Sequence, residues 1–193
     1  MYFDNPFKTR LPETHEALPG RLQEIQTSKL HSVLNTPFHP PFSDNFETLV
    51  VGMGCFWGAE RLFWNCEGVY STAVGYAGGQ TPNPTYEEVC SGNTGHAEVV
   101  RLTFDENKIS FKKILDLFFK MHDPTQKDMQ FPDVGTQYRS EIFYEDEKQK
   151  QEALEILKEF NEKLDGKIQT NVSKIKNYSK AEEYHQKYIE KNR

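Results

Sequence analysis

The stretch from Val50 to Trp64, VVGMGCFWGAERLFW, constrains the fold more than any other part of the sequence. Its apolar beginning, within ETLVVGM, has the length and composition of a buried strand. The residues after the two glycines have the spacing of a helix, and the glycines allow a tight turn in between. The chain therefore passes from a strand directly into a helix, and Cys55 lies at that turn.

Further patterns extend this strand–helix unit. VYSTAVGY, AEVVRLTFD and QYRSEIFY predict three more strands. A second helix, which Ser110 can cap, has one apolar face made of Phe111, Ile114, Leu115, Phe118 and Phe119. The order β-α-β-β-α-β predicts an α+β fold: a two-layer sandwich with a ferredoxin-like (split βαβ) core and a mixed, mainly antiparallel sheet.

The rest of the chain adds peripheral elements and long loops. A long helix striped by Leu154, Leu157, Phe160 and Leu164 is expected to end near Gly166. IQTNVSKI then predicts a strand, and AEEYHQKYI a short final helix. The loops GGQTPNPTYEE and DPTQKDMQFPDVGT are longer than their connections need, and such loops often carry function.

The proline-rich beginning of the chain differs from the rest. We expect residues 1–45 to form an N-terminal extension packed on the domain, with a short helix from Arg21 to His31. Residues 46–193 are expected to form a single catalytic domain, since no internal repeat or interdomain linker interrupts them.

Composition excludes several classes of protein. The formal net charge of −6 argues against a nucleic-acid binder, because phosphate contacts need clustered Lys and Arg. No apolar run approaches the roughly 20 residues of a membrane-spanning helix, and the first residues lack a signal-peptide layout. The three cysteines contain no C-x-x-C pair and make a poor disulfide framework. We therefore expect a cytoplasmic protein with reduced cysteines.

Two common ligands fit the sequence badly. The glycines in GMGCFWG resemble a dinucleotide fingerprint, but Phe56 and Trp57 would crowd the pyrophosphate, and the next strand ends without an acidic ribose partner. His96-x-Glu98 supplies half of a zinc-deaminase signature, but the P-C-x-x-C half is missing. The six histidines are scattered, so no metal site is predicted.

A thiol nucleophile at Cys55 fits better. Unpaired N–H groups and the dipole at a helix N-terminus favour an anion and lower the pKa of a thiol. Phe56 and Trp57 would form an apolar pocket that suits a small uncharged group such as a methyl. The structural alternative is a small buried cysteine that packs under the sheet beside two core aromatic residues.

Several motifs together resemble the peptide methionine sulfoxide reductase A family. They are GMGCFWGAERLF, GYAGGQTPNPTYEEVCSGNTGHAEVV, HDPTQ and GTQYRS, from about Val50 to Ser140, with weaker similarity at AEEYHQKY. The resemblance implies reduction of methionine S-sulfoxide, in proteins, in peptides or free, by attack of Cys55 on the sulfoxide sulfur. Methionine sulfoxide is the reversible product of methionine oxidation, so the implied role is protein repair.

The resemblance also assigns roles to individual residues. Glu98 supplies the proton, and it should be partly buried with a raised pKa. The hydroxyls of Tyr86 and Tyr138 hold the sulfoxide oxygen. The remaining implied substrate-binding residues are Phe56 and Trp57 for the methyl group, Asp133 for a peptide backbone, and His185 at the edge of the cleft. The sequence QFP before Asp133 is less typical of the family.

The second half of the reaction is less defined. Attack leaves a sulfenic acid on Cys55, which many family members resolve with cysteines in a glycine-rich tail; this sequence ends at HQKYIEKNR without one. Cys66 lies eleven positions after Cys55, about 16 Å along a helix, too far for a disulfide. Cys90 stays open as a resolving cysteine. We expect an external thiol, from a thioredoxin-like or glutaredoxin-like protein or glutathione, and no bound cofactor.

Two other functions stay open at this point. A different thiol reaction at Cys55, such as peroxide reduction, would use the same nucleophile without the apolar pocket. A peptide-binding module would use Phe56 and Trp57 as an anchor site but leaves the pairing of Cys55 with Glu98 without purpose. We expect a monomer.

Overall fold

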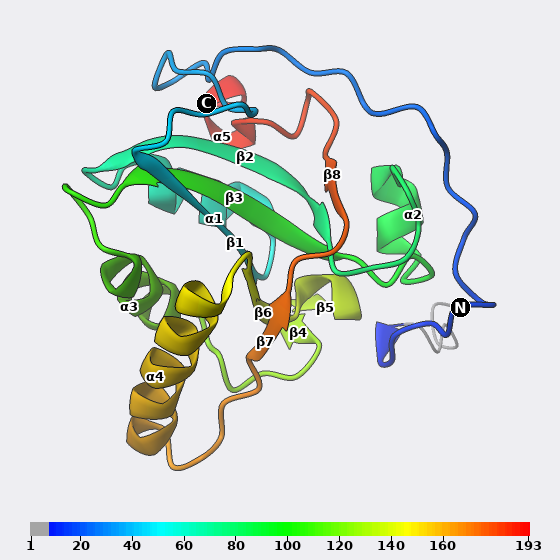
Figure 1. Ribbon diagram of the computed structural model, residues 1–193. Coiled ribbons are helices and arrows are strands. Elements are labelled where there is room, and N and C mark those ends of the chain that lie inside the picture. Colours follow the sequence, from blue (N-terminus) through cyan, green and yellow to red (C-terminus); the bar gives the residue numbers. More distant parts are fainter. Residues whose placement is uncertain (1–7) are drawn as a thin grey trace.

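A six-stranded sheet forms the centre of the computed structural model, which describes residues 8–193 (Figure 1). Its strands are β1 (Phe46–Met53), β2 (Val69–Ala77), β3 (Ala97–Asp105), β6 (Ser140–Tyr144), β7 (Asn171–Lys174) and β8 (Tyr178–Lys180). Their spatial order is β7-β6-β1-β3-β2-β8. All neighbours are antiparallel except β6 and β7, which are parallel. The predicted α+β class with a mixed, mainly antiparallel sheet is confirmed.

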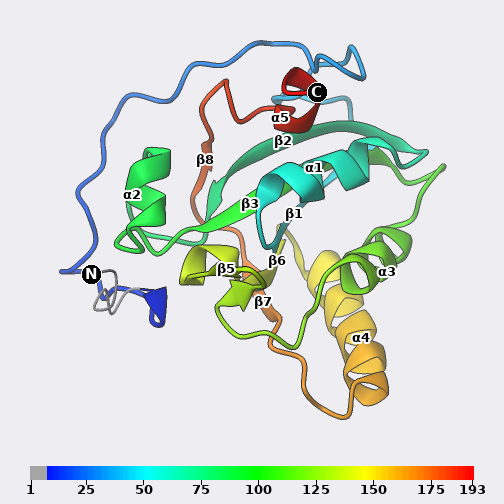
Figure 2. The same ribbon diagram turned by 180° about the vertical axis from the view of Figure 1, so that it is seen from behind.

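Three helices share one hydrophobic core with the sheet: α1 (Phe56–Trp64), α3 (Phe111–Met121) and α4 (Glu147–Lys163). Phe63 of α1, Phe118 of α3 and Ile156 of α4 belong to the same buried cluster as Leu49 and Val51 of β1. Figure 2 shows α3 and α4 side by side and α1 lying across β2 and β3, in agreement with their contacts. This core holds the turn between β1 and α1 in place.

Side-chain caps explain where several helices begin. Ser110 accepts a hydrogen bond from the Lys113 backbone N–H at 3.2 Å, which confirms the predicted cap of α3. Asp146 caps α4 in the same way. Thr85 and Glu88 form a complete capping box at the start of α2 (Tyr86–Cys90). This short helix lies in the loop GGQTPNPTYEE, and it sets the position of Tyr86.

The structure corrects the predicted buried face of α4. Ala153, Ile156 and Phe160 are buried, whereas Leu154 is 41% exposed. Residues 153, 156 and 160 follow the three-and-four spacing of one helix face. The leucine stripe was misleading because it gave no weight to alanine, which here belongs to the core.

Other predicted elements are shorter than expected. The strand in QYRSEIFY begins only at Ser140, because Thr136–Tyr138 form a 3₁₀-helix. The final helix is limited to α5 (Tyr188–Lys191), and residues 183–187 form turns. The loop DPTQKDMQFPDVGT contains a small hairpin of β4 (Met129–Gln130) and β5 (Asp133–Val134).

Residues 8–45, here called the N-terminal strap, run over the surface from α2 past the start of β2 to β1 (Figures 1 and 2). The helix predicted from Arg21 to His31 is wrong. The backbone N–H group of Arg21 donates to Pro82 O, and that of Ser28 donates to the Glu183 carboxylate. These two hydrogen bonds tie the stretch to the body of the protein.

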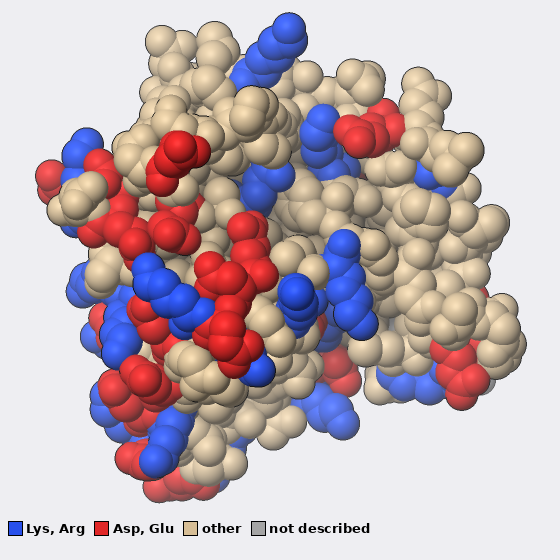
Figure 3. Space-filling view, viewed as in Figure 1, with Lys and Arg blue, Asp and Glu red and all other residues tan. Residues whose placement is uncertain are grey.

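The surface view shows how charge is distributed. On the face drawn in Figure 3, acidic and basic side chains are interspersed over the side where α3 and α4 lie, and basic residues form no continuous patch on that face. Within residues 8–193, none of the helices combines the length and the apolar character needed to cross a membrane.

Candidate active site

Cys55 occupies the N-cap position of α1, directly after β1. The preceding Gly54 has φ +90°, and a Cβ atom there would lie 2.7 Å from Cβ of Gln130. Only glycine meets both conditions, so the turn can press against the β4–β5 hairpin. The backbone N–H groups of Trp57 and Gly58 point toward the Cys55 sulfur. The thiol is partly exposed at the beginning of the helix.

Glu98 faces this turn from β3. Its side chain is buried, and Oε2 accepts a hydrogen bond from the Phe56 backbone N–H at 3.1 Å. Burial raises the pKa of Glu98 to about 8, and the charge of Asp133 adds to the effect. At neutral pH the carboxyl group therefore carries its proton. This burial and raised pKa agree with the sequence-based expectation.

The expected lowering of the Cys55 pKa is wrong for the protein without substrate. Burial, together with the charge of Glu98, raises the pKa of Cys55 to about 11. The N–H groups of Trp57 and Gly58 act in the opposite direction but do not outweigh burial. Cys55 is therefore a thiol at rest, and it needs a partner that accepts its proton or stabilises its thiolate.

Tyr86 at the start of α2 and Tyr138 in the 3₁₀-helix belong to the same cluster. Burial raises the pKa of both phenols, and the charge of Glu98 acts on both. The pKa of Tyr138 also responds to Asp133 and Cys55. Both hydroxyls therefore stay protonated and can donate hydrogen bonds. The fold thus places five predicted site residues from separate elements in one electrostatic environment.

Phe56, Trp57 and His185 form the aromatic part of the site. The Trp57 indole N–H donates to His185 Nδ1 at 3.0 Å. The His185 ring lies 5.2 Å from the Phe56 ring and 4.4 Å from the Tyr86 ring, measured between centroids. His185 was expected at the edge of the cleft, yet it is buried and contacts three of the other predicted residues.

Two residues near His185 were missed by the sequence analysis. Tyr188 stacks on Trp57 with ring centroids 3.8 Å apart and an interplanar angle of 9°. Glu182 accepts hydrogen bonds from the Tyr86 backbone N–H and from the Tyr76 hydroxyl, each at 2.8 Å. Glu182, His185 and Tyr188 are three residues apart in AEEYHQKY. This regular spacing was the signal that could have revealed them.

Residues 182–188, here called the C-terminal segment, are fixed to the sheet and to α1. The Gln186 side chain both donates to and accepts from the Val74 backbone. The Lys187 backbone N–H donates to Glu60 Oε2 at 2.7 Å, and its ammonium lies 3.4 Å from Glu60 Oε1. The ring of Phe38, from the N-terminal strap, covers that ammonium at 3.4 Å.

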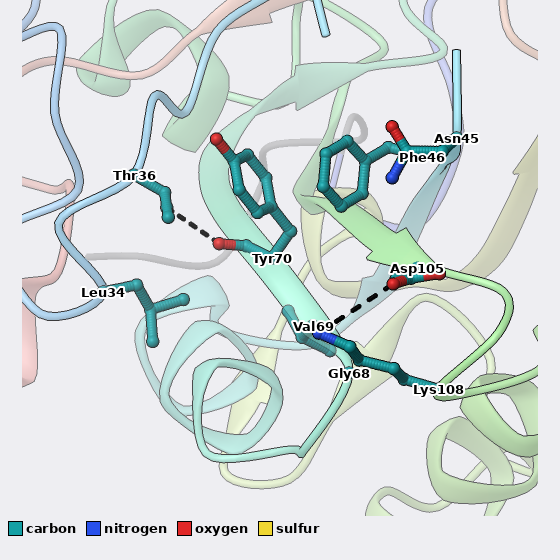
Figure 4. Close-up of a pocket in the computed structure, with 9 residues that line it drawn as sticks. All are labelled: Leu34, Thr36, Asn45, Phe46, Gly68, Val69, Tyr70, Asp105 and Lys108. Carbon is teal, nitrogen blue, oxygen red and sulfur yellow. Dashed lines mark hydrogen bonds and ion pairs between the residues drawn. The ribbon is translucent and has the colours of Figure 1, made fainter. Parts of the chain in front are cut away.

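A hollow of about 350 Å³ opens on the other side of Cys55. Its lining residues are Met53, Cys55, Gly58, Ala59, Leu62, Met121, His122, Gln130, Phe131 and Asp133. A second hollow, of about 460 Å³ between the strap and the start of β2, has no cysteine or histidine in its lining (Figure 4). Its walls include the stacked rings of Phe46 and Tyr70. Of these two hollows, the one that contains Cys55 has a candidate nucleophile in its lining, so we take it as part of the candidate active site.

The other two cysteines, Cys66 and Cys90, lie outside the hollow that contains Cys55. Cys66 follows the end of α1 and donates to Leu62 O. The pKa of Cys90 is raised by burial, and the charge of Glu98 also acts on it. All three cysteines are free thiols. Within residues 8–193 no group of three His, Cys, Asp or Glu side chains could hold a metal ion.

Comparison with known proteins identifies the family. The family model described as peptide methionine sulfoxide reductase matches residues 47–193. This chain belongs to that family. A peptide methionine sulfoxide reductase MsrA from Brucella anthropi is 48% identical over 189 residues, which cover 96% of this chain and 87% of the relative. The family members are oxidoreductases that act on methionine sulfoxide, and this chain is an enzyme of that class.

Solved structures of family members have the same fold. Methionine sulfoxide reductase A of Corynebacterium diphtheriae matches with a TM-score of 0.89 and 39% identity, over 95% of this chain and 91% of that one. Mxr1 from Saccharomyces cerevisiae in reduced form matches with a TM-score of 0.74 and 34% identity, over 86% and 93% of the two chains. Mxr1 has also been solved in complex with Trx2.

Proposed function

We propose that this chain reduces methionine S-sulfoxide, in oxidised proteins, in peptides or free, to methionine through Cys55. The observation that supports this most strongly is the pair formed by Cys55 and Glu98. A buried carboxyl group with a pKa of about 8 is held at the start of α1, beside the only predicted nucleophile. Such a group is suited to give a proton to an oxygen that becomes more basic during the reaction.

Two proton transfers accompany the proposed chemical step: Cys55 loses one proton, and Glu98 gives one to the substrate oxygen. The Cys55 thiolate attacks the sulfoxide sulfur, and the sulfoxide oxygen takes a proton from Glu98. Transfer of this oxygen to the Cys55 sulfur then breaks the substrate S–O bond and the S–S bond formed by the attack, which leaves Cys55 as a sulfenic acid and releases methionine. The Cys55 thiol loses its proton to solvent before the attack, and Glu98 regains a proton from solvent after it, so the protons balance. The sulfoxide is thereby reduced by two electrons and the cysteine is oxidised by two.

The surrounding residues bind and orient the substrate in this proposal. The methyl group lies against Phe56 and Trp57, and the hydroxyls of Tyr86 and Tyr138 donate to the sulfoxide oxygen. Donors that are fixed before the reaction stabilise the charge that develops on that oxygen. Asp133 binds the backbone of a peptide substrate. His185 acts through Trp57, whose indole it holds.

A decisive test is single-turnover reduction of the two isolated diastereomers of N-acetylmethionine sulfoxide. The wild type should convert the S epimer, and Cys55→Ser should abolish conversion while circular dichroism stays unchanged. Cys66→Ser is the matched control, because Cys66 lies at the far end of α1, and it should keep the activity. Turnover by Cys55→Ser would refute the proposal. Preference for hydrogen peroxide over the sulfoxide would favour a different thiol reaction.

Restoration of Cys55 is proposed to use an external thiol. A first thiol displaces water from the sulfenic acid and forms a mixed disulfide, and a second thiol releases Cys55. A thioredoxin-like or glutaredoxin-like protein or glutathione could serve, and no bound cofactor is required. The complex of the yeast relative Mxr1 with Trx2 supports a thioredoxin-like partner.

Counting free thiols after one turnover without reductant tests this second step. Direct reduction of the sulfenic acid by an external thiol predicts the loss of one thiol, at Cys55. Loss of two thiols would show an internal disulfide. Cys90→Ser and Cys66→Ser, tested separately, would identify the partner cysteine. Cys90 is the more plausible of the two, because the charge of Glu98 acts on its pKa.

Several broader expectations remain part of the proposal. We propose that residues 46–193 are one catalytic domain, with residues 1–45 as an extension. The neighbouring strands β6-β1-β3-β2, with α1 and α3 on one face, support a ferredoxin-like, two-layer core. A cytoplasmic monomer that binds neither nucleic acid nor membrane is proposed, and size-exclusion chromatography with light scattering tests the monomer.

A further inference from the structure

Phe131 is an unusual residue to find beside a catalytic centre, because 76% of its surface is exposed. It lies at the tip of the β4–β5 hairpin and lines the same hollow as Cys55. Met121, which lines the same hollow, is 55% exposed. Large apolar side chains that surround a hollow in this way often mark a place where another molecule binds.

The hairpin that carries Phe131 is firmly held. The Gln130 side chain donates to and accepts from the Asp123 backbone, both at 3.0 Å. The Phe131 backbone N–H donates to Gln126 Oε1 at 2.8 Å. Gln130 also packs against Gly54, next to Cys55. The exposed ring is therefore presented at a fixed place relative to the nucleophile.

The chemistry of the hollow selects among possible occupants. Most of its walls are apolar: Met53, Ala59, Leu62, Met121 and Phe131. His122 adds no positive charge at neutral pH, because burial lowers its pKa to about 4. Cys55 is an uncharged thiol at this pH. Asp133 is the only acidic side chain among the lining residues, and a carboxylate there would repel an acidic side chain.

The position of the hollow indicates which part of a substrate reaches it. Consecutive Cα atoms are about 3.8 Å apart, and side chains alternate sides in an extended chain. A polypeptide that brings a methionine sulfoxide to Cys55 can therefore place a residue one or two positions away over the hollow, whose lining includes Cys55. We propose that the hollow around Phe131 is a subsite for an apolar side chain flanking methionine sulfoxide in an oxidised polypeptide. This inference rests on the proposed function.

The experiment compares three matched peptides, acetyl-X-Met(S-O)-X-amide with X as Leu, Gly or Asp, using dithiothreitol as reductant. The wild type should show a kcat/KM for the Leu peptide roughly tenfold above that for the Gly peptide, the usual size of apolar discrimination. The Asp peptide should be slower than the Gly peptide. Phe131→Ala should reduce the Leu:Gly ratio toward one, and Asp133→Asn should raise the Asp:Gly ratio.

Leu154→Ala is the matched control, because Leu154 is an exposed leucine of α4 outside the hollow; it should keep the wild-type ratios. Equal rates for the Leu and Gly peptides in the wild type would overturn the subsite. So would an unchanged Leu:Gly ratio in Phe131→Ala.

Two further outcomes are distinguishable from these. If Phe131→Ala keeps the peptide ratios but slows turnover with reduced thioredoxin, the hollow binds the reductant and the subsite is wrong. If the wild type fails on all three peptides and on free methionine S-sulfoxide, the proposed function itself fails.

Discussion

On one side of Cys55, Trp57 and Glu98 are held by hydrogen bonds, whereas on the side of the hollow the apolar side chains of Met121 and Phe131 are exposed. Trp57 is held by the His185 ring nitrogen and by the parallel ring of Tyr188. Phe131, which lines the hollow with Cys55, is largely open to solvent. The first side, which includes Glu98, is here called the closed side, and the hollow is the open side.

The difference between the two sides corresponds to two tasks. Orienting a sulfoxide for attack requires groups that are fixed before the substrate arrives, because their ordering then costs nothing during the reaction. Accepting many different polypeptides requires a surface that discriminates weakly. A site built to hydrogen-bond its ligand discriminates strongly, because a ligand without the bonding group leaves polar groups of the site unpaired. Apolar contacts discriminate between ligands by modest factors. The closed side fits the first task, and the open side fits the second.

Replacing Glu98, on the closed side, is expected to have the largest effect, and the effect is on the rate of the chemical step. Glu98→Gln should slow the chemical step by roughly 10²- to 10⁴-fold, since it removes the proton donor. In the wild type the reactive form holds one proton on Glu98 and none on Cys55, so the rate should rise with pH through about 8. In the variant only Cys55 loses a proton, and the rise should move to higher pH because burial still raises the pKa of this thiol.

Single-turnover rates between pH 6 and pH 10 measure both effects, with Glu98→Asp as the variant that keeps a carboxyl group. A rise that stays near pH 8 in Glu98→Gln would mean that another group controls the rate, and it would remove Glu98 from the role of acid.

The second prediction concerns what holds the closed side together. Lys187 and Glu60 are both almost completely buried, and burial lowers the pKa of Lys187 to about 8. Lys187→Met leaves the Glu60 carboxylate buried without its cation, which should lower the free energy of unfolding by about 3–5 kcal/mol. Urea denaturation measures this loss.

The double variant Lys187→Met/Glu60→Gln should recover much of that loss, because it removes both charges. If the double variant is as unstable as the sum of the two single variants, the pair is not the coupled unit that the geometry indicates.

A smaller effect is expected from the contact between His185 and Trp57. His185→Ala leaves a buried indole N–H without its acceptor, at a cost of about 1–3 kcal/mol. If this contact orients the substrate methyl pocket, KM for free methionine sulfoxide should rise while kcat changes less. Trp57→Phe removes the donor, so adding His185→Ala to that variant should change KM little. An equal KM effect in both backgrounds would assign His185 a role that is independent of Trp57.

The sequence could predict some features of Cys55 and the closed side but not others. Cys55 and Glu98 were identifiable because their motifs are contiguous and each lies on a strand or at its end. The burial of His185 was not predictable, because residues 183–187 form turns whose position depends on contacts with Trp57 and Glu60. The raised pKa of Cys55 was missed because it depends on the burial of the thiol and the nearby charge of Glu98, which only the assembled fold shows.

The smallest expected effect is on the free energy of unfolding when a residue of the open side is replaced. It tests whether the exposed side chains of the hollow serve binding or the fold. Met121→Ser changes an apolar residue of the hollow that is 55% exposed, so the free energy of unfolding should change by no more than about 0.5 kcal/mol. The same variant should lower the preference for the Leu peptide, because one apolar wall of the subsite becomes polar. Urea denaturation and the Leu:Gly ratio separate the two outcomes. A loss of stability above about 1 kcal/mol with an unchanged ratio would show that the exposed side chains of the hollow serve the fold. The contrast between a closed side fixed for chemistry and an open side kept for binding would then no longer hold.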